Sequence, residues 1–307
     1  MKKTATVFIA VLAIAGALSA QEAPKVGVEF SQRMDSEFVD YDVAKTSMGN
    51  DAVYSRTEIK ASAEIKLADN MSLTTSVKDR LEGRFNPKSD ASGMRERNRL
   101  YLNADLGMKA SDLANLGFGL EYRLESDVKG GTASPVLPAN RITPTFSVKG
   151  KAGDVSYGIA QSVPLYLDAT PTDDANDLVV EFDGVYSAGY GMKLSETAKL
   201  SFAFNTNLIV TLPKEDAPSS DKATILNYGT LTATLGLGDF SPFLGAFMNT
   251  SVDKAGDTAA NIVGATFGAA FASGKTSLSF AYNKGYNTAE GMDNRSEDTL
   301  SVAVKIK

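Results

Sequence analysis

Charged side chains recur at every second position in the first half of the chain, and their types suggest what they could do. A guanidinium group binds carboxylate and phosphate oxygens in pairs, so an arginine that faces water can attract an anion. A glutamate on a neighbouring segment can instead neutralise it. The candidate residues are Arg56, Lys78, Arg80, Arg97, Arg99, Asp105, Glu121, Arg123 and Arg141.

The stretch RTEIKASAEIKLADNMSLTTSVKDRLEG (56–83) shows which elements must position these residues. Arg56 and Glu58 occupy one parity of this stretch, whereas Ile59 and Ala61 occupy the other. Alternation with a period of two predicts a β-strand that has one polar and one apolar face. The alternation restarts after ADN, a turn-forming sequence, which indicates a hairpin.

The same pattern continues along the chain and predicts fourteen strands. They span residues 26–33, 53–67, 71–83, 95–108, 115–127, 141–149, 154–163, 178–194, 198–211, 222–236, 241–250, 261–272, 276–285 and 298–307. The connections between them alternate strictly between short and long. The long ones, such as 34–52 and 164–177, are rich in polar and turn-forming residues that belong in water.

Two architectures put an apolar face on every strand. In a soluble sandwich, two sheets pack these faces together. In a membrane barrel they face lipid, and the closed sheet satisfies all backbone hydrogen bonds. The predicted strands average about ten to twelve residues, which matches a tilted crossing of a bilayer better than an ordinary strand. We therefore predict an all-β, closed antiparallel up-and-down transmembrane barrel of about fourteen strands, with twelve or sixteen also allowed.

The N-terminus has the features of a signal peptide. Lys2 and Lys3 precede an apolar run at 7–18, and small residues end the segment. We expect a signal peptide at 1–20 and a transmembrane barrel at 21–307. Without Lys2 and Lys3, 29 basic and 37 acidic residues remain, a net charge of −8 that argues against nucleic acid as a partner.

The chain contains no His and no Cys, which removes many kinds of catalytic site. Imidazole bases, thiolate nucleophiles and zinc sites built from these side chains are all excluded. We therefore expect no catalytic residues, no bound metal and no cofactor, and we predict that the chain is not an enzyme.

The whole segment 21–307 resembles the outer-membrane porins of Gram-negative bacteria, and in strand number the monomeric fourteen-stranded porin. The resemblance implies a location in the cell outer membrane and a channel for small hydrophilic solutes. It implies outer-membrane lipid, lipopolysaccharide and the barrel-assembly machinery as partners. One feature departs from the pattern. Such barrels commonly end in an aromatic residue, whereas this chain ends in Ile306 and Lys307, which indicates a different assembly signal or lineage.

The candidate residues then have two possible roles on an inner wall. They could line a constriction and favour anions, or Arg and Glu on neighbouring strands could pair and simply hold the wall together. The strands from 198 to 285 bring mainly small neutral residues to the opposite wall. A different function also fits the sequence: an adhesin or receptor that uses the barrel as an anchor and binds through loops 34–52 and 164–177.

Overall fold

A computed structural model describes residues 24–41, 52–85, 95–129, 139–166, 180–212, 224–252, 258–287 and 295–307 of the chain. Within these ranges every regular element is a β-strand. No helix in the described part is long and apolar enough to span a membrane. The expected signal peptide at 1–20 lies outside the described residues.

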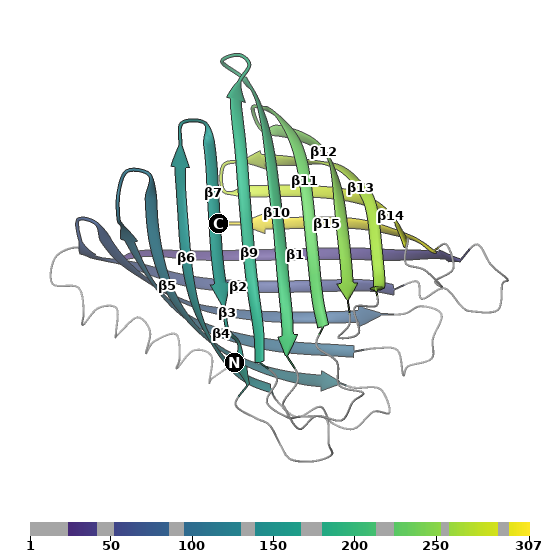
Figure 1. Ribbon diagram of the computed structural model, residues 1–307, viewed down its shortest axis with the longest axis horizontal. Coiled ribbons are helices and arrows are strands. Elements are labelled where there is room, and N and C mark those ends of the chain that lie inside the picture. The colour runs from purple at the N-terminus through teal and green to yellow at the C-terminus, as the bar shows by residue number, and fades with distance from the viewer. Residues whose placement is uncertain are drawn as a thin grey trace.

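The strands form one antiparallel sheet that curves round on itself (Figure 1). They are β1 (Lys25–Tyr41), β2 (Ala52–Ala68), β3 (Met71–Phe85), β4 (Arg95–Lys109), β5 (Ala114–Lys129), β6 (Ala139–Ala152), β7 (Val155–Ser162), β8 (Leu165–Tyr166), β9 (Val180–Lys193), β10 (Ala198–Leu212), β11 (Thr224–Leu237), β12 (Phe240–Val252), β13 (Thr258–Ser273), β14 (Thr276–Asn287) and β15 (Arg295–Ile306).

The sheet closes because its first and last strands pair with each other. β1 and β15 pair from Phe30–Ile306 to Tyr41–Arg295, and β5 pairs with β6, so that the ring of neighbours has no gap. A closed sheet leaves no unpaired edge, which is the condition for crossing hydrocarbon with strands. The predicted closed antiparallel barrel is thereby confirmed.

Strands β7 and β8 are two pieces of one wall strand. Both pair with β6 in the same register, as the pairs Thr145–Ser162 and Ile142–Leu165 show. The barrel wall therefore has fourteen strands, as the alternation predicted.

Pro164 explains why this wall strand is interrupted. Val163 N donates to Pro144 O on β6 at 3.1 Å. Because successive residues of an antiparallel strand bond to opposite neighbours, the next N–H would point to β9. Proline has no N–H, so this bond is missing. The pairing of β7 with β9 accordingly ends at Ser162–Asp183.

Tight turns join the strands at one end of the barrel. Gly153, Gly238 and Gly274 each sit in such a turn with positive φ, at 61°, 64° and 57°. Glycine reaches this left-handed region without the steric cost that a Cβ would add. The long connections join the strands at the other end, and most of their residues lie outside the described ranges.

The predicted boundary of the first strand is wrong at its loop end. β1 runs to Tyr41, so residues 34–41, assigned to a loop from the sequence, are strand. The alternation weakens there although the hydrogen bonding to β15 continues. A strand that projects beyond the membrane meets water on both faces, so its two parities need not differ in polarity.

The apolar side chains lie on the outer surface. Leu244, Phe267 and Val28 are 63%, 53% and 58% exposed, as expected for residues that face lipid. Buried hydrophobic residues are few in the described part of the chain, and Ala63 and Ile65, packed with Leu73, form its hydrophobic cluster. Stability must therefore come chiefly from the closed backbone network.

Candidate functional site

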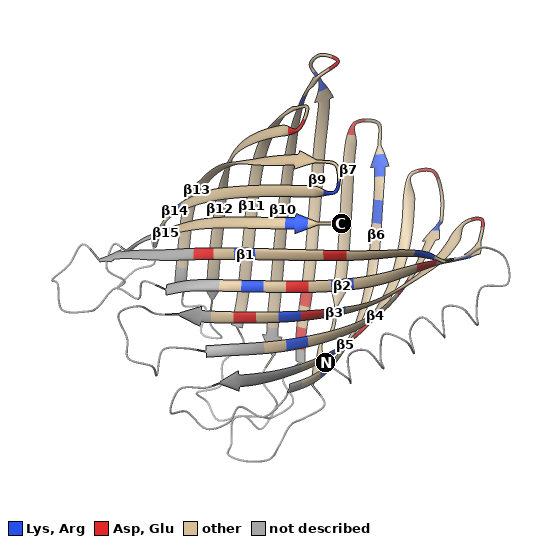
Figure 2. Ribbon diagram, turned by 180° about the vertical axis from the view of Figure 1, so that it is seen from behind, with Lys and Arg blue, Asp and Glu red and all other residues tan. Residues whose placement is uncertain are grey.

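The inner face of the barrel is the parity that carries the polar residues. Asn103, Glu121, Thr143, Ser162 and Asp183 come from five strands and line one common recess, which places them on the concave side of the sheet. The strand register then assigns every other residue to a face. Figure 2 shows the consequence for charge: coloured residues lie mostly on β1–β6, whereas β10–β14 are largely tan.

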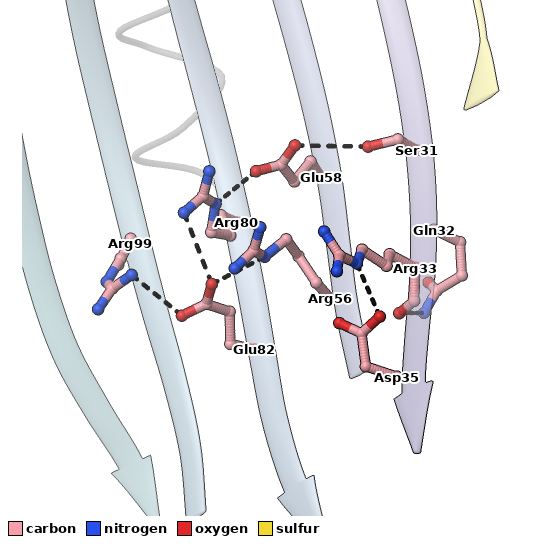
Figure 3. Close-up of polar contacts among 9 residues, drawn as sticks. All are labelled: Ser31, Gln32, Arg33, Asp35, Arg56, Glu58, Arg80, Glu82 and Arg99. Carbon is pink, nitrogen blue, oxygen red and sulfur yellow. Dashed lines mark hydrogen bonds and ion pairs between the residues drawn. The ribbon is translucent and has the colours of Figure 1, made fainter. Parts of the chain in front are cut away.

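A group of five charged residues, which we name the arginine–glutamate cluster, lies on the inner face of β2–β4 (Figure 3). Arg56 Nε donates to Glu82 Oε1 at 2.9 Å, and Arg99 Nη1 lies 3.1 Å from Glu82 Oε2. Arg80 Nε donates to Glu58, and Arg80 Nη1 is 3.5 Å from Glu82 Oε1. Glu82 therefore contacts three arginines from three neighbouring strands.

Lys78 and Tyr101 extend the cluster along the wall. Lys78 Nζ lies 4.0 Å from the centre of the Tyr101 ring, and Arg80 Cζ lies 5.2 Å from it. Cations over an aromatic face are attracted by its quadrupole. Tyr101 is only 5% exposed, so it acts as a platform under both cations. Tyr101 is not among the candidate residues predicted from the sequence, although this tyrosine has the same parity as Arg99.

The cluster has more positive than negative charge, and its arginines differ in how exposed they are. Arg80 and Arg99 are 18% and 16% exposed and lie along the wall, whereas Arg56 is 42% exposed. Two glutamates oppose three arginines and Lys78. An excess of positive charge therefore faces the interior, and Arg56 presents most of it.

The remaining candidates form a second group on β4–β6. Arg141 Nη2 donates to Glu121 Oε1 at 3.2 Å, and the register places Arg123 directly opposite Arg141. Asp105 lies opposite Gly119 on the same inner face. The backbone of Arg97 belongs to β4, but its side chain lies outside the described residues.

The wall opposite the cluster is more apolar than the sequence analysis predicted. β12 lies seven strands from β4 around the fourteen-stranded ring, and its inner parity includes Phe243 and Phe247. The Phe247 ring packs over Gly264 of β13 and reaches Gly285 of β14. Leu244 and Met248 are exposed on the outer face, so Phe243 and Phe247, which have the opposite parity, lie on the inner face. The predicted small, neutral wall is therefore wrong at these two positions.

A signal for these two rings was present in the sequence. The stretch SPFLGAFMNT (241–250) is apolar on both parities, so alternation alone does not assign its faces. The register pairs Phe240 with Phe271, which is exposed on the outer face. Counting from Phe240 in steps of two leaves Phe243 and Phe247 on the inner parity.

No metal centre is evident among the described residues, since no three Asp or Glu side chains there converge on a common point. The inner face can instead act through fixed charge and shape. It combines a net positive cluster, a second charged group and, opposite them, two aromatic rings.

Comparisons with known proteins show the fold and leave the family open. No family model matches the chain, and no curated protein matches it. Among solved structures, an outer-membrane channel from Pseudomonas putida F1 has a TM-score of 0.55 at 11% identity, covering 95% of this chain and 98% of that one. A bacterial polysaccharide outer membrane secretin has a TM-score of 0.53 at 11% identity, with 91% and 98% covered.

A third structure has a similar architecture. The TodX monoaromatic hydrocarbon channel, as a deltaS2 mutant, has a TM-score of 0.53 at 9% identity, covering 93% of this chain and 90% of that one. Identities this low show likeness of fold alone. The chain has the closed barrel architecture of outer-membrane channels.

Proposed function

We propose that the chain forms a water-filled channel in a cell outer membrane, through which small hydrophilic solutes diffuse passively, with a preference for anions. We further propose that it reaches this membrane by the signal peptide at 1–20 and acts without catalysis. Outer-membrane lipid, lipopolysaccharide and the barrel-assembly machinery are its proposed partners.

The observation that carries this proposal is the net positive arginine–glutamate cluster on the inside of a closed barrel. A fourteen-stranded barrel is wider than an eight-stranded barrel, whose interior side chains can fill. It is narrower than a porin of sixteen to eighteen strands. Charge fixed on the wall of such a space acts on every solute that passes. The names of the structural neighbours, several of them channels, support the same function.

The ion pairs in the wall do not oppose an anion preference. Pairing holds Arg80 and Arg99 against the sheet, which is the structural role considered from the sequence. The excess positive charge remains, and Arg56 is the most exposed of the three arginines. Both roles can therefore operate in one cluster, through different arginines.

Planar-bilayer recording of the purified, detergent-folded chain tests the proposal. Discrete current steps are expected, and in a KCl gradient the reversal potential should have the sign of chloride preference. Heat-denatured protein is the control. Folded protein without current steps would contradict the channel and favour the barrel as an anchor for an adhesin or receptor. Steps with cation preference would contradict the anion preference alone.

A further inference from the structure

A recess in the inner wall lies beside the charged groups described above. It has a volume of about 290 Å³, close to the lower limit of small-molecule sites. Its polar lining comes from five wall strands and includes Asn103, Asp105, Glu121, Arg141, Thr143 and Asp183.

The recess extends to the point where the pairing between β7 and β9 ends. Pro164 lines it and is fully buried, and Ser162 and Asp183 are the last residues that pair across this boundary. Since Pro164 cannot donate a hydrogen bond toward β9, the two strands are not bonded to each other at this edge of the recess.

Two polar groups face this recess without a partner. Thr143 is 7% exposed, and its Oγ1 makes no hydrogen bond. Asp183 Oδ1 is likewise buried and accepts no hydrogen bond. A buried carboxylate oxygen without a donor is costly, so a group that brings N–H donors into the recess would be stabilised there.

The charges in the recess favour a cation. Three carboxylates, those of Asp105, Glu121 and Asp183, stand beside one lining cation, Arg141, which already donates to Glu121. Lys60 and Lys149 act electrostatically on Asp105, whereas Arg141 is the charged neighbour of Asp183. Among the three carboxylates, Asp183 is the one with a buried oxygen, Oδ1, that accepts no hydrogen bond.

The spacing of these carboxylates selects the kind of cation. In the described part of the chain no three acidic side chains converge as metal ligands do. A divalent ion requires such convergence, whereas an ammonium group can donate to separate acceptors. We propose that the recess is a binding subsite for the primary ammonium group of a small solute, with Asp183 as its main acceptor and Thr143 as a second one.

This inference rests on the proposed function in one respect: the solute reaches the recess from the water-filled interior. The inner wall would then attract both cationic and anionic groups, because the net negative recess and the net positive cluster both include residues of β4. A solute that carries both an ammonium and an acidic group can then contact both signs of charge on its way through.

The test uses ethanolamine hydrochloride as the probe and the full chain folded in detergent. Its affinity is measured by saturation-transfer NMR for the wild type and for Asp183→Asn, Thr143→Val and Glu64→Gln. Asp183→Asn should weaken binding by about tenfold, the loss of one charge-assisted hydrogen bond. Thr143→Val should weaken it by roughly threefold, the loss of one neutral hydrogen bond. Glu64, an inward-facing carboxylate outside the recess, provides the matched control and should change nothing.

A competition experiment makes the result specific. Tetramethylammonium has the charge but no N–H donor, and it should not compete with ethanolamine. Equal competition, or binding that neither Asp183→Asn nor Thr143→Val weakens, would overturn the subsite. Circular dichroism checks that each variant folds, and Thr143→Val decides the outcome if Asp183→Asn does not fold.

Channel recordings separate this inference from the proposed function. Binding that depends on Asp183 in a protein without current steps would refute the channel and support the subsite. Current steps in a protein that does not bind ethanolamine would support the channel and refute the subsite.

Discussion

Arg56 and Glu82 stand directly opposite each other on β2 and β3, with the arginine Nε 2.9 Å from the carboxylate Oε1. The same carboxylate also contacts Arg80 and Arg99. One glutamate thus links strands β2, β3 and β4 and neutralises part of three positive charges. Glu82 therefore influences both the stability of the barrel wall and the electrostatic field inside the barrel.

Replacing Glu82 by Gln should separate these two effects. The three arginines would lose their shared counter-charge, so anion preference should rise and the free energy of unfolding should fall by about 1–3 kcal/mol. Reversal potentials in a KCl gradient and urea unfolding in lipid vesicles measure the two quantities. Glu64→Gln is the control, since it makes the same charge change on the inner face outside the cluster, and it should raise anion preference less than Glu82→Gln. Unchanged selectivity in Glu82→Gln would mean that the cluster does not set the field.

Arg56 and Arg99 should respond differently to replacement by Ser. Arg56 is 42% exposed and Arg99 is 16% exposed. Arg56→Ser should lower anion preference and cost less than about 1 kcal/mol of stability, as exposed ion pairs contribute little. Arg99→Ser should cost more stability and change selectivity less. Reversal potential and thermal unfolding of both variants decide this, and the opposite ranking would contradict it.

The two inward-facing rings of β12 should influence conductance. Phe247→Ala removes a ring that packs over Gly264 on the inner face, so the single-channel conductance should increase. Phe267→Ala is the matched control, because Phe267 is 53% exposed and has the outer parity. Its loss should leave the conductance unchanged. A similar conductance change in both variants would show that it arises from a general loosening of the wall.

The tight turns should be sensitive to a Cβ at positive φ. Gly238 has a φ of 64°, and replacing it by Ala should destabilise the barrel by about 1–2 kcal/mol. Gly236 lies on the adjacent strand without a positive φ, and a Cβ there would make only ordinary contacts. Gly236→Ala should therefore be tolerated. Urea unfolding of the two variants compares them, and equal stability would argue against strain in the turn.

The fold could be predicted from the sequence because each strand of a membrane barrel alternates polar and apolar residues with a period of two. Each hairpin needs a polar face, an apolar face and a turn, and all three are visible in stretches such as 56–83. Strand ends were less predictable. In residues 34–41 the alternation weakens while the pairing with β15 continues, so the extension of β1 to Tyr41 was not predicted.

The candidate site was only partly predictable. Parity identifies which residues face inward, and the structure brings Arg56, Arg80 and Arg99 together through Glu82. Parity does not identify which partners meet, because this depends on the stagger between strands. It also does not reveal the recess beside Pro164, because the side chains that line it come from five strands and meet only through the stagger of the sheet.

The barrel can close only when β15 pairs with β1. These strands come from opposite ends of the chain, so the ring is completed only after Arg295–Ile306 has been synthesised. Until then, β1 and β14 each present an open edge that can pair with other chains. Contacts between such distant segments also form slowly. Folding of this protein should therefore be slow and prone to aggregation unless the incomplete sheet is protected until its final strand arrives.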